Sequence, residues 1–287
     1  MWVYIQELPD NAFTLVRYLS REQYGSTPLL YGQYYDAPFE LTTSKYWAPL
    51  DGKYKKVDGP VDAKYFSEGK MLFPRMWSSS PDGRYEEFYE YYTGGKGTKL
   101  QGSTHRKPTM GANLHYFFDY QMNWMYWRYF MWNFVGRQNQ IHAPNPGDIF
   151  HGNWESGVKF IDDFRLGDQS DAPETLAGDK GKNHYYFLPL LLGLLGLFFQ
   201  FDKDKRGCWL NFLMFFMTGI AIVIYLNQPP YQVRERDYAY AGSFYFFCVW
   251  IGMAVAAIYG LAEKVLNGKG TAPVAALVSV ACLCVPV

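Results

Sequence analysis

The chain has 287 residues, and its 27 Lys and Arg residues balance its 27 Asp and Glu residues. This zero net charge argues against a nucleic-acid partner held by bulk electrostatic attraction. The length allows one large domain or two smaller ones. Aromatic residues make up 20% of the chain, and only twelve charged residues follow residue 184. A polar front section is therefore joined to an apolar rear section, which argues against a wholly soluble protein.

Residues 1–112 are predicted to form an aromatic-rich α+β section outside the membrane. Its first element is a helix over residues 10–25, because apolar residues recur there at helical spacing. Asp10 can cap the amino terminus of this helix, and Gly25 can end it.

The middle of the front section is predicted to consist of short strands and turns. Residues 28–80 are rich in Tyr, Pro and Gly, and Asp51 with Gly52 is a typical hairpin turn. Residues 81–92 predict a short helix. The Gly-rich segment 94–111 has the composition of a mobile linker.

Residues 113–184 are predicted to contain an aromatic helix at 113–135, followed by an outer loop. This helix is long enough to span a membrane, but Asp119 and Arg128 would then lie at apolar depth. A helix lying flat in the interface satisfies both charges more cheaply. If the helix did span, residues 1–112 would lie on the cytoplasmic side.

The rear section, residues 185–287, is predicted to hold about four transmembrane helices, because its charge-free runs approach the length of about 20 residues that a span requires. The predicted spans are 185–201, 209–228, 242–262 and 272–287. The predicted fold class is therefore a mainly α membrane protein with an aromatic-rich α+β extramembrane section. The alternative for each run is a buried helix of a soluble protein.

Short positive loops stay on the cytoplasmic side of a membrane. The links at 202–207 and 263–270 carry such Lys and Arg residues, so the segment 227–241 and the front section are predicted to face outward. The start of the chain has no signal peptide, and its last apolar run stops abruptly. Both features predict a piece of a longer membrane protein.

Several segments together resemble one family of long multi-spanning membrane proteins from Bacteroidetes-type bacteria, the domain of unknown function 2723. The segments that carry the resemblance are NWMYWRYFMWNFVGRQNQ at 123–140, GNWESGVKFIDDFRLGDQ at 152–169, GKNHYYFLPLLLGLLGLFFQ at 181–200 and NQPPYQVRERDYAYAGSFYFF at 227–247. The opening of the chain also fits this family.

This family is related to transmembrane protein 260 of animals, an O-mannosyltransferase with a GT-C-type fold. The resemblance implies transfer of a sugar from a polyprenyl-phosphate donor to an exported protein, in the inner membrane of a bacterium with the front section in the periplasm. The acidic catalytic motif of the family has no counterpart here. Catalytic residues are therefore unknown, and the chain alone is expected to be inactive.

Arg234, Glu235, Arg236 and Asp237 form the sharpest candidate substrate-binding group. In an extended segment the two Arg side chains would point one way and the two acids the other. Paired guanidinium groups suit a phosphate, such as that of a lipid-linked sugar donor or a membrane lipid. The alternative is a salt-bridged loop or headgroup anchor.

A second candidate group lies on and just after the aromatic helix. Its members are Arg128, Asn133, Arg137, Gln138 and Asn139. Polar donors beside aromatic ring faces suit a sugar, and the aromatic excess in 28–92 and 113–135 marks where to look for one. The alternative is an interfacial helix with cations at its carboxyl end. A weaker acidic group is expected to be solvated surface, and its members are Glu155, Asp162 and Asp163.

No metal site and no cofactor are predicted, because the His residues lack ligand spacing and the Cys residues lie in or beside apolar runs. The metal requirement of a transferase is left open. Two functions rival the glycosyltransferase: a non-catalytic envelope scaffold or glycan-binding membrane protein, and a transporter. Long stretches without charge disfavour the transporter.

Overall fold

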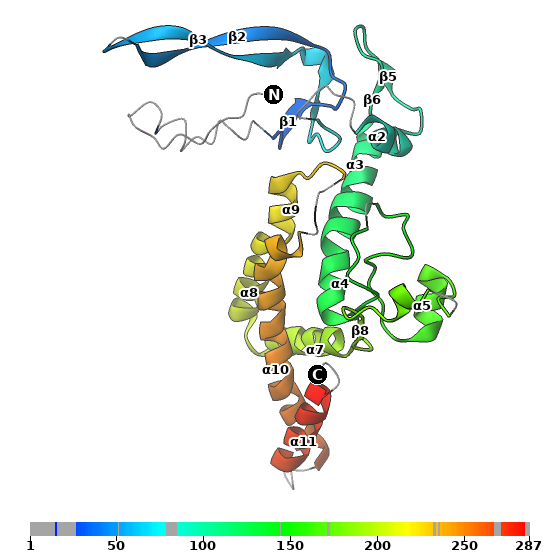
Figure 1. The fold of residues 1–287 in the computed structure, drawn as a ribbon. Helices are drawn as coiled ribbons and strands as arrows, with labels where there is room; N and C mark the ends of the chain where they lie inside the picture. The colour runs from blue at the N-terminus through cyan, green and yellow to red at the C-terminus, as the bar shows by residue number, and fades with distance from the viewer. Residues whose placement is uncertain are drawn as a thin grey trace. The chain divides into compact units, whose positions relative to one another are not determined.

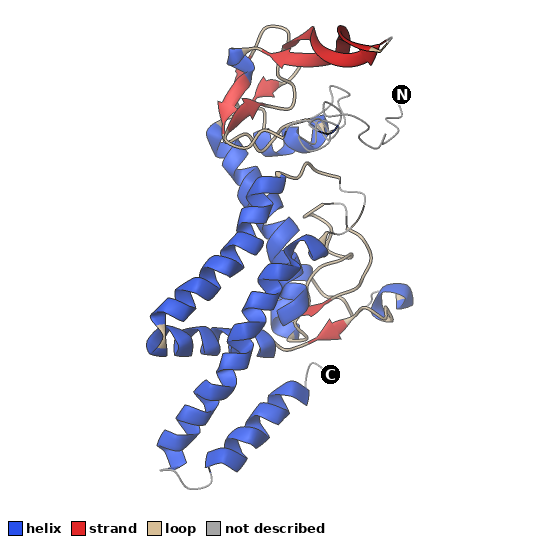
Figure 2. Ribbon diagram, turned by 90° about the vertical axis from the view of Figure 1, so that its left-hand side faces the viewer, coloured by secondary structure: helices blue, strands red, loops and turns tan. Residues whose placement is uncertain are grey.

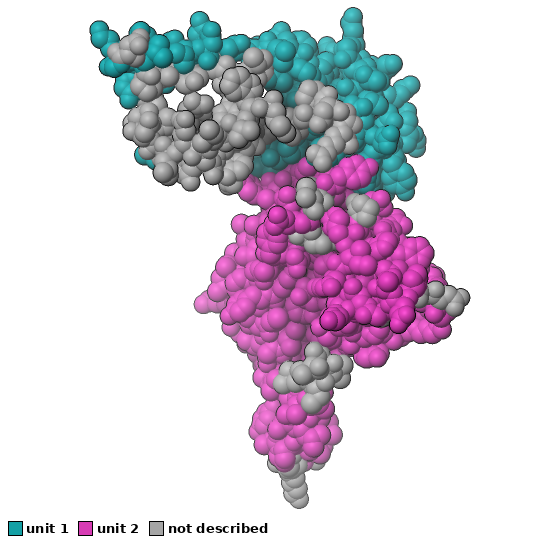
Figure 3. Space-filling model, viewed as in Figure 1, with its two compact units in different colours: residues 1–116 teal, residues 117–287 magenta. Residues whose placement is uncertain are grey.

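The computed structural model describes Leu15 and residues 27–50, 52–78, 85–143, 145–170, 173–231, 234, 236–266 and 271–284. The chain divides into two compact units, Met1–Tyr116 and Phe117–Val287 (Figure 3). Of the helix predicted over 10–25, only Leu15 lies within the described residues, and it is helical.

A long antiparallel hairpin dominates the first unit (Figure 1). Its strands are β2 (Phe39–Leu50) and β3 (Lys53–Tyr65), and Leu50 pairs with Lys53. This pairing confirms the predicted hairpin turn at Gly52; Asp51 lies outside the described residues. Gly52 has a φ of +72°, which a glycine adopts without steric cost.

Among the residues described from Thr27 onward, the first unit also has two shorter strand pairs, one short 3₁₀-helix and two α-helices. The pair β1 (Tyr31–Gln33) and β4 (Lys70–Leu72) is antiparallel, and the turn η2 (Ser67–Gly69) leads into β4. The helix predicted at 81–92 is α2 (Glu86–Thr93), and α3 (Met110–Tyr116) ends the unit.

The prediction of a mobile linker at 94–111 is wrong. This segment contains the antiparallel pair β5 (Thr98–Lys99) and β6 (Arg106–Lys107). Its loop is tied to the unit by Asp36, whose Oδ2 accepts from Ser103 Oγ at 2.8 Å and from His105 N. Composition alone could not reveal these contacts, because Asp36 is distant in sequence.

The second unit is mostly helical. It begins with the π-helix η3 (Phe117–Trp127), which runs into α4 (Arg128–Phe134). The strands β7 (Gly136–Arg137) and β8 (Asn183–His184) pair around a loop that holds α5 (Lys159–Leu166) and α6 (Glu174–Ala177). The remaining elements are α7 (Leu188–Lys203), α8 (Lys205–Thr218), α9 (Ile220–Leu226), η4 (Asp237–Tyr240), α10 (Ala241–Leu266) and α11 (Thr271–Cys284).

Aromatic side chains form the core of the second unit. The buried cluster joins η3 and α4 to α8, α9 and α10, and it includes Tyr126, Phe130, Phe215, Phe247 and Trp250. The Phe130 ring meets the Phe247 ring edge-on at 4.8 Å, an arrangement that aromatic pairs prefer. The aromatic stretch thus supplies a buried helix face. Its position at a membrane interface stays a prediction.

Helix α7 lies across α10 in both ribbon views (Figures 1 and 2). Glycines on α7 allow a close approach there. A Cβ added to Gly196 would lie 1.7 Å from the Trp250 carbonyl oxygen, and one added to Gly193 would lie 2.2 Å from the Phe247 ring. A hydrogen bond from Trp250 Nε1 to Gln200 Oε1, 2.8 Å long, adds to this contact.

The prediction of four transmembrane helices is wrong. Helices form in all four predicted regions, but among the described residues only Lys205–Leu226 and Asp237–Leu266 are long and apolar enough to cross a membrane. Helix α7 has 16 residues and α11 has 14. At about 1.5 Å per residue, both are shorter than a hydrocarbon core of about 30 Å.

Candidate functional site

Arg128 is buried in an aromatic cage within the second unit, with 3% of its surface exposed. Its guanidinium carbon lies 4.2 Å from the Trp124 ring centre and 4.9 Å from that of Trp132. Its Nη1 donates to the Gly152 carbonyl at 2.8 Å. The cation is thus held by ring faces and a carbonyl. Because the described residues already enclose it, a ligand would reach it only after a rearrangement.

Two other members of this predicted group, Asn133 and Arg137, are more accessible, whereas Gln138 and Asn139 are buried. Asn133 is exposed, and its Nδ2 donates to the Tyr129 carbonyl at 2.7 Å. Arg137 is half-buried, and its guanidinium carbon lies 4.3 Å from the Trp132 ring centre. Trp132 therefore lies against both Arg128 and Arg137.

Tyr129 on α4 connects the Arg234–Asp237 group with the helix that carries Arg128. The backbone N–H of Arg236 donates to Tyr129 Oη at 3.2 Å, and the Tyr129 ring centre lies 4.5 Å from the Arg128 guanidinium carbon. Arg234 is exposed, whereas Arg236 and Asp237 are half-buried. Glu235 lies outside the described residues. Binding of a donor phosphate by this group stays a prediction.

The acidic group was expected to be solvated surface, and for two of its members this is wrong. Asp162 is buried, and its carboxylate accepts from the backbone N–H of Ser156 at 2.9 Å and of Gly157 at 2.8 Å. Glu155 is buried and pairs with Lys182 at 3.3 Å. Both carboxylates hold the loop around α5, a role that their sequence spacing does not reveal.

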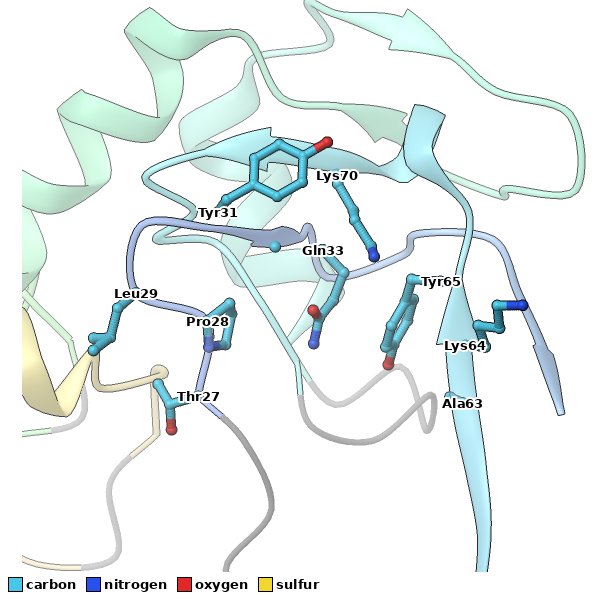
Figure 4. Close-up of a pocket in the computed structure, with 10 residues that line it drawn as sticks. Thr27, Pro28, Leu29, Tyr31, Gln33, Ala63, Lys64, Tyr65 and Lys70 are labelled. Atoms are coloured by element: carbon cyan, nitrogen blue, oxygen red, sulfur yellow. The ribbon is translucent and has the colours of Figure 1, made fainter. Parts of the chain in front are cut away.

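A hollow of about 490 Å³ opens in the first unit, among the strands β1, β3 and β4 (Figure 4). We call it the Tyr65 groove. Its described lining combines aromatic, amide, ammonium and small side chains, namely Thr27, Pro28, Leu29, Tyr31, Gly32, Gln33, Ala63, Lys64, Tyr65 and Lys70.

Strand register explains why the polar groups converge in the Tyr65 groove. Gln33 and Lys70 are direct partners in the β1–β4 pair, so their side chains share one face. Tyr65 ends β3 beside them, and burial raises the pKa of its hydroxyl. The Lys64 side chain points away from the Tyr65 ring in the close-up (Figure 4). The groove therefore presents a ring face, an amide and an ammonium group together.

No motif in the sequence indicates the Tyr65 groove. Its only signal was the aromatic excess over residues 28–92. The lining residues come from strands that are separated along the chain, and a sequence pattern does not show which strands pair. The groove lies within the aromatic-rich region, but the aromatic excess does not indicate which residues line it.

A histidine joins α2 to the β5–β6 loop in the same unit. His105 Nε2 lies 2.9 Å from Glu86 Oε2, and His105 Nδ1 bonds Glu90 Oε1. Burial lowers the pKa of His105, but hydrogen bonds to Glu90 and Glu86 outweigh it, so the pKa lies above its ordinary value. Among the described residues, no group of three or more His, Cys, Asp or Glu is arranged to hold a metal ion.

Residues 25–118 match a family described as "Family of unknown function (DUF8416)". This segment includes all the described residues that line the Tyr65 groove. No curated protein and no solved structure matches the chain. The comparisons therefore do not connect the chain with the domain of unknown function 2723 or with transmembrane protein 260.

Proposed function

We propose that this chain is a membrane-anchored glycan-binding protein, with the Tyr65 groove as its binding site. The observation that carries the proposal is the convergence of Gln33, Tyr65 and Lys70 in one groove. An aromatic ring face suits the C–H groups of a sugar, and amide and ammonium groups bond its hydroxyls. A volume of about 490 Å³ is within the range of small-ligand sites.

The proposed anchor consists of two antiparallel spans in a bacterial inner membrane. One is α8 with α9, and the other is η4 with α10; both are long and apolar enough to cross. Lys205 begins the first span and Lys264 lies in the last turn of the second. If both cross, these lysines share one side. The positive-inside tendency then makes that side cytoplasmic.

Glycosyl transfer from a lipid-linked donor stays a second prediction, and it rests on the sequence resemblance alone. The buried position of Arg128 gives it no support. The exposed Arg234 and half-buried Arg236 remain the side chains to test for a donor phosphate. We therefore rank glycan binding first.

A glycan array probed with the purified full chain in detergent tests the proposal. We expect Gln33→Ala and Tyr65→Ala each to weaken binding of the captured glycan about tenfold, which corresponds to about 1.4 kcal/mol. Tyr65→Phe keeps the ring face and should lose less than Tyr65→Ala. The matched control is Gln101→Ala, because Gln101 is exposed and lies outside the groove lining.

Two results would contradict the proposal. Either no glycan is captured by a chain that shows its native thermal transition, or the captured glycan binds the Gln33 and Tyr65 variants as tightly as the unmodified chain.

A further inference from the structure

We propose that the tip of the β2–β3 hairpin, residues 45–56, docks onto the headgroup layer of an anionic membrane. This inference concerns a surface outside the Tyr65 groove lining. It rests on the membrane anchor of the proposed function, since a bilayer must lie within reach of the chain.

Charge is distributed unevenly along the hairpin. The tip contains four lysines and one acid, Asp51. The base of the hairpin holds Glu40, Asp58, Asp62 and a single cation, Lys64. The cationic end is therefore the tip. Lysines near a bilayer surface are attracted by anionic headgroups.

Exposed apolar side chains lie among these lysines. Trp47 is 46% exposed, Leu50 is 48% exposed and Tyr54 is 48% exposed. A two-stranded ribbon covers few of its own apolar groups and is marginally stable in water. Trp and Tyr place an apolar body in the interface and a polar group in the headgroup region. The tip thus has the composition of an interfacial segment.

Strand register shows how the tip would enter the headgroup layer. Trp47 pairs with Lys56, whose Nζ lies 5.4 Å from the Trp47 ring centre. Leu50 pairs with Lys53, and alternation along the strand places this pair on the opposite face. Each face combines an apolar side chain with a lysine. An end-on approach therefore lets the apolar side chains and lysines of both faces reach the headgroup layer. A ribbon lying flat would do so for one face only.

A lipid surface fits this combination better than a polyanion in solution. Lysines alone would suit either partner, but Leu50 offers nothing to a phosphate backbone. Leu50 and the exposed Trp47 ring gain from entering an apolar boundary. The zero net charge of the whole chain also argues against general attraction to nucleic acid.

The test uses the full chain in nanodiscs whose lipids carry brominated acyl chains, which quench nearby Trp fluorescence. One set contains phosphatidylcholine alone, and the other also contains phosphatidylglycerol. The contribution of Trp47 is the difference between the unmodified chain and Trp47→Phe. We expect Trp47 to be quenched in anionic discs and to lose this quenching in neutral discs.

Replacing Lys45, Lys53, Lys55 and Lys56 by Gln should abolish Trp47 quenching in anionic discs. The matched control replaces four exposed lysines elsewhere, namely Lys96, Lys99, Lys159 and Lys180, and should keep it. If the four Gln substitutions shift the thermal transition, a salt titration of the unmodified chain is used in place of this variant. Added salt should reduce Trp47 quenching, because exposed charges are screened.

Trp209 separates the two proposals. It is 65% exposed on α8, so Trp209→Phe reports the anchor. The docking proposal would be overturned if Trp209 is quenched and Trp47 is not. It would also be overturned if Trp47 is quenched equally in both lipid mixtures. Tip-dependent binding of a short DNA strand without Trp47 quenching would also overturn it. If Trp209 is not quenched, the result contradicts the membrane anchor and not the docking of the tip. Quenching of Trp47 by anionic vesicles added to the chain would then still test the docking.

Discussion

At the scale of single residues, buried polar side chains hold loops that carry no regular structure of their own. Asn113 is fully buried on α3. Its Oδ1 accepts from the backbone N–H of Arg75 at 2.8 Å, and its Nδ2 donates to the Phe73 carbonyl at 2.7 Å. One amide thereby fixes the chain that follows β4.

Replacing Asn113 by Ala is expected to lower the free energy of unfolding of the first unit by about 2–4 kcal/mol, because buried backbone groups lose their partner. Chemical denaturation followed by circular dichroism measures the change. Gln101→Ala is the control, since Gln101 is exposed, and should change stability by less than about 0.5 kcal/mol. Equal stability of the two variants would contradict the role of Asn113.

His105 should make the stability of the first unit depend on pH. Its pKa in the folded state is raised above the ordinary value of 6.5 by Glu90 and Glu86, against the effect of burial. The interaction of protonated His105 with Glu90 and Glu86 stabilises the fold. This contribution is fully present below the unfolded-state pKa and is lost as pH rises through the folded-state pKa. Thermal unfolding across neutral pH should show that fall. His105→Gln should flatten it, and an unchanged pH profile in this variant would contradict the assignment.

At the scale of secondary-structure elements, glycines decide how closely helices approach. Gly219 separates α8 from α9, and a Cβ added to it would lie 2.5 Å from Tyr126 Oη and 2.8 Å from Ser243 Cβ. The Tyr126 hydroxyl bonds Ser243 Oγ at 3.2 Å in the same place. Small residues at helix contacts are typical of helices that pack in a membrane.

The α7–α10 contact gives the sharpest test of this packing. Gly196→Ala would force its new methyl group into the Trp250 backbone. We expect it to destabilise the second unit by about 1–3 kcal/mol. The matched control is Gly252→Ala on α10, where an added Cβ meets no atom within 4 Å. Thermal unfolding in detergent should show a lower midpoint for Gly196→Ala, while Gly252→Ala stays neutral or gains slightly. Equal midpoints would contradict the contact.

At the scale of the whole molecule, the proposed two-span anchor predicts a membrane topology. In a variant without native cysteines, Arg234→Cys should react with a membrane-impermeant maleimide on intact cells. Lys264→Cys should react only after permeabilisation. Both positions are exposed in the fold, so the bilayer alone would cause the difference. Labelling of both positions in intact cells, or the reverse pattern, would contradict the topology.

The sequence by itself determined features that depend on local pattern. Asp51 and Gly52 specify the hairpin turn because that turn needs a positive φ, and apolar runs specify the helices of the rear section. The predicted number of four spans did not follow, because α7 is apolar yet shorter than a bilayer core. Whether a run crosses a membrane or lies across another helix depends on its partners.

Only the tertiary structure decided which polar residues are buried and which side chains share a site. Arg128 has a polar sequence signature, but rings of its own helix and the Gly152 carbonyl, 24 residues away, enclose it. Asp162 is buried because the chain folds back so that its carboxylate accepts from the backbone N–H groups of Ser156 and Gly157. The Tyr65 groove likewise exists because β1 pairs with β4, more than thirty residues further along the chain. Long-range strand and helix contacts set burial and proximity, and local periodicity carries no record of them.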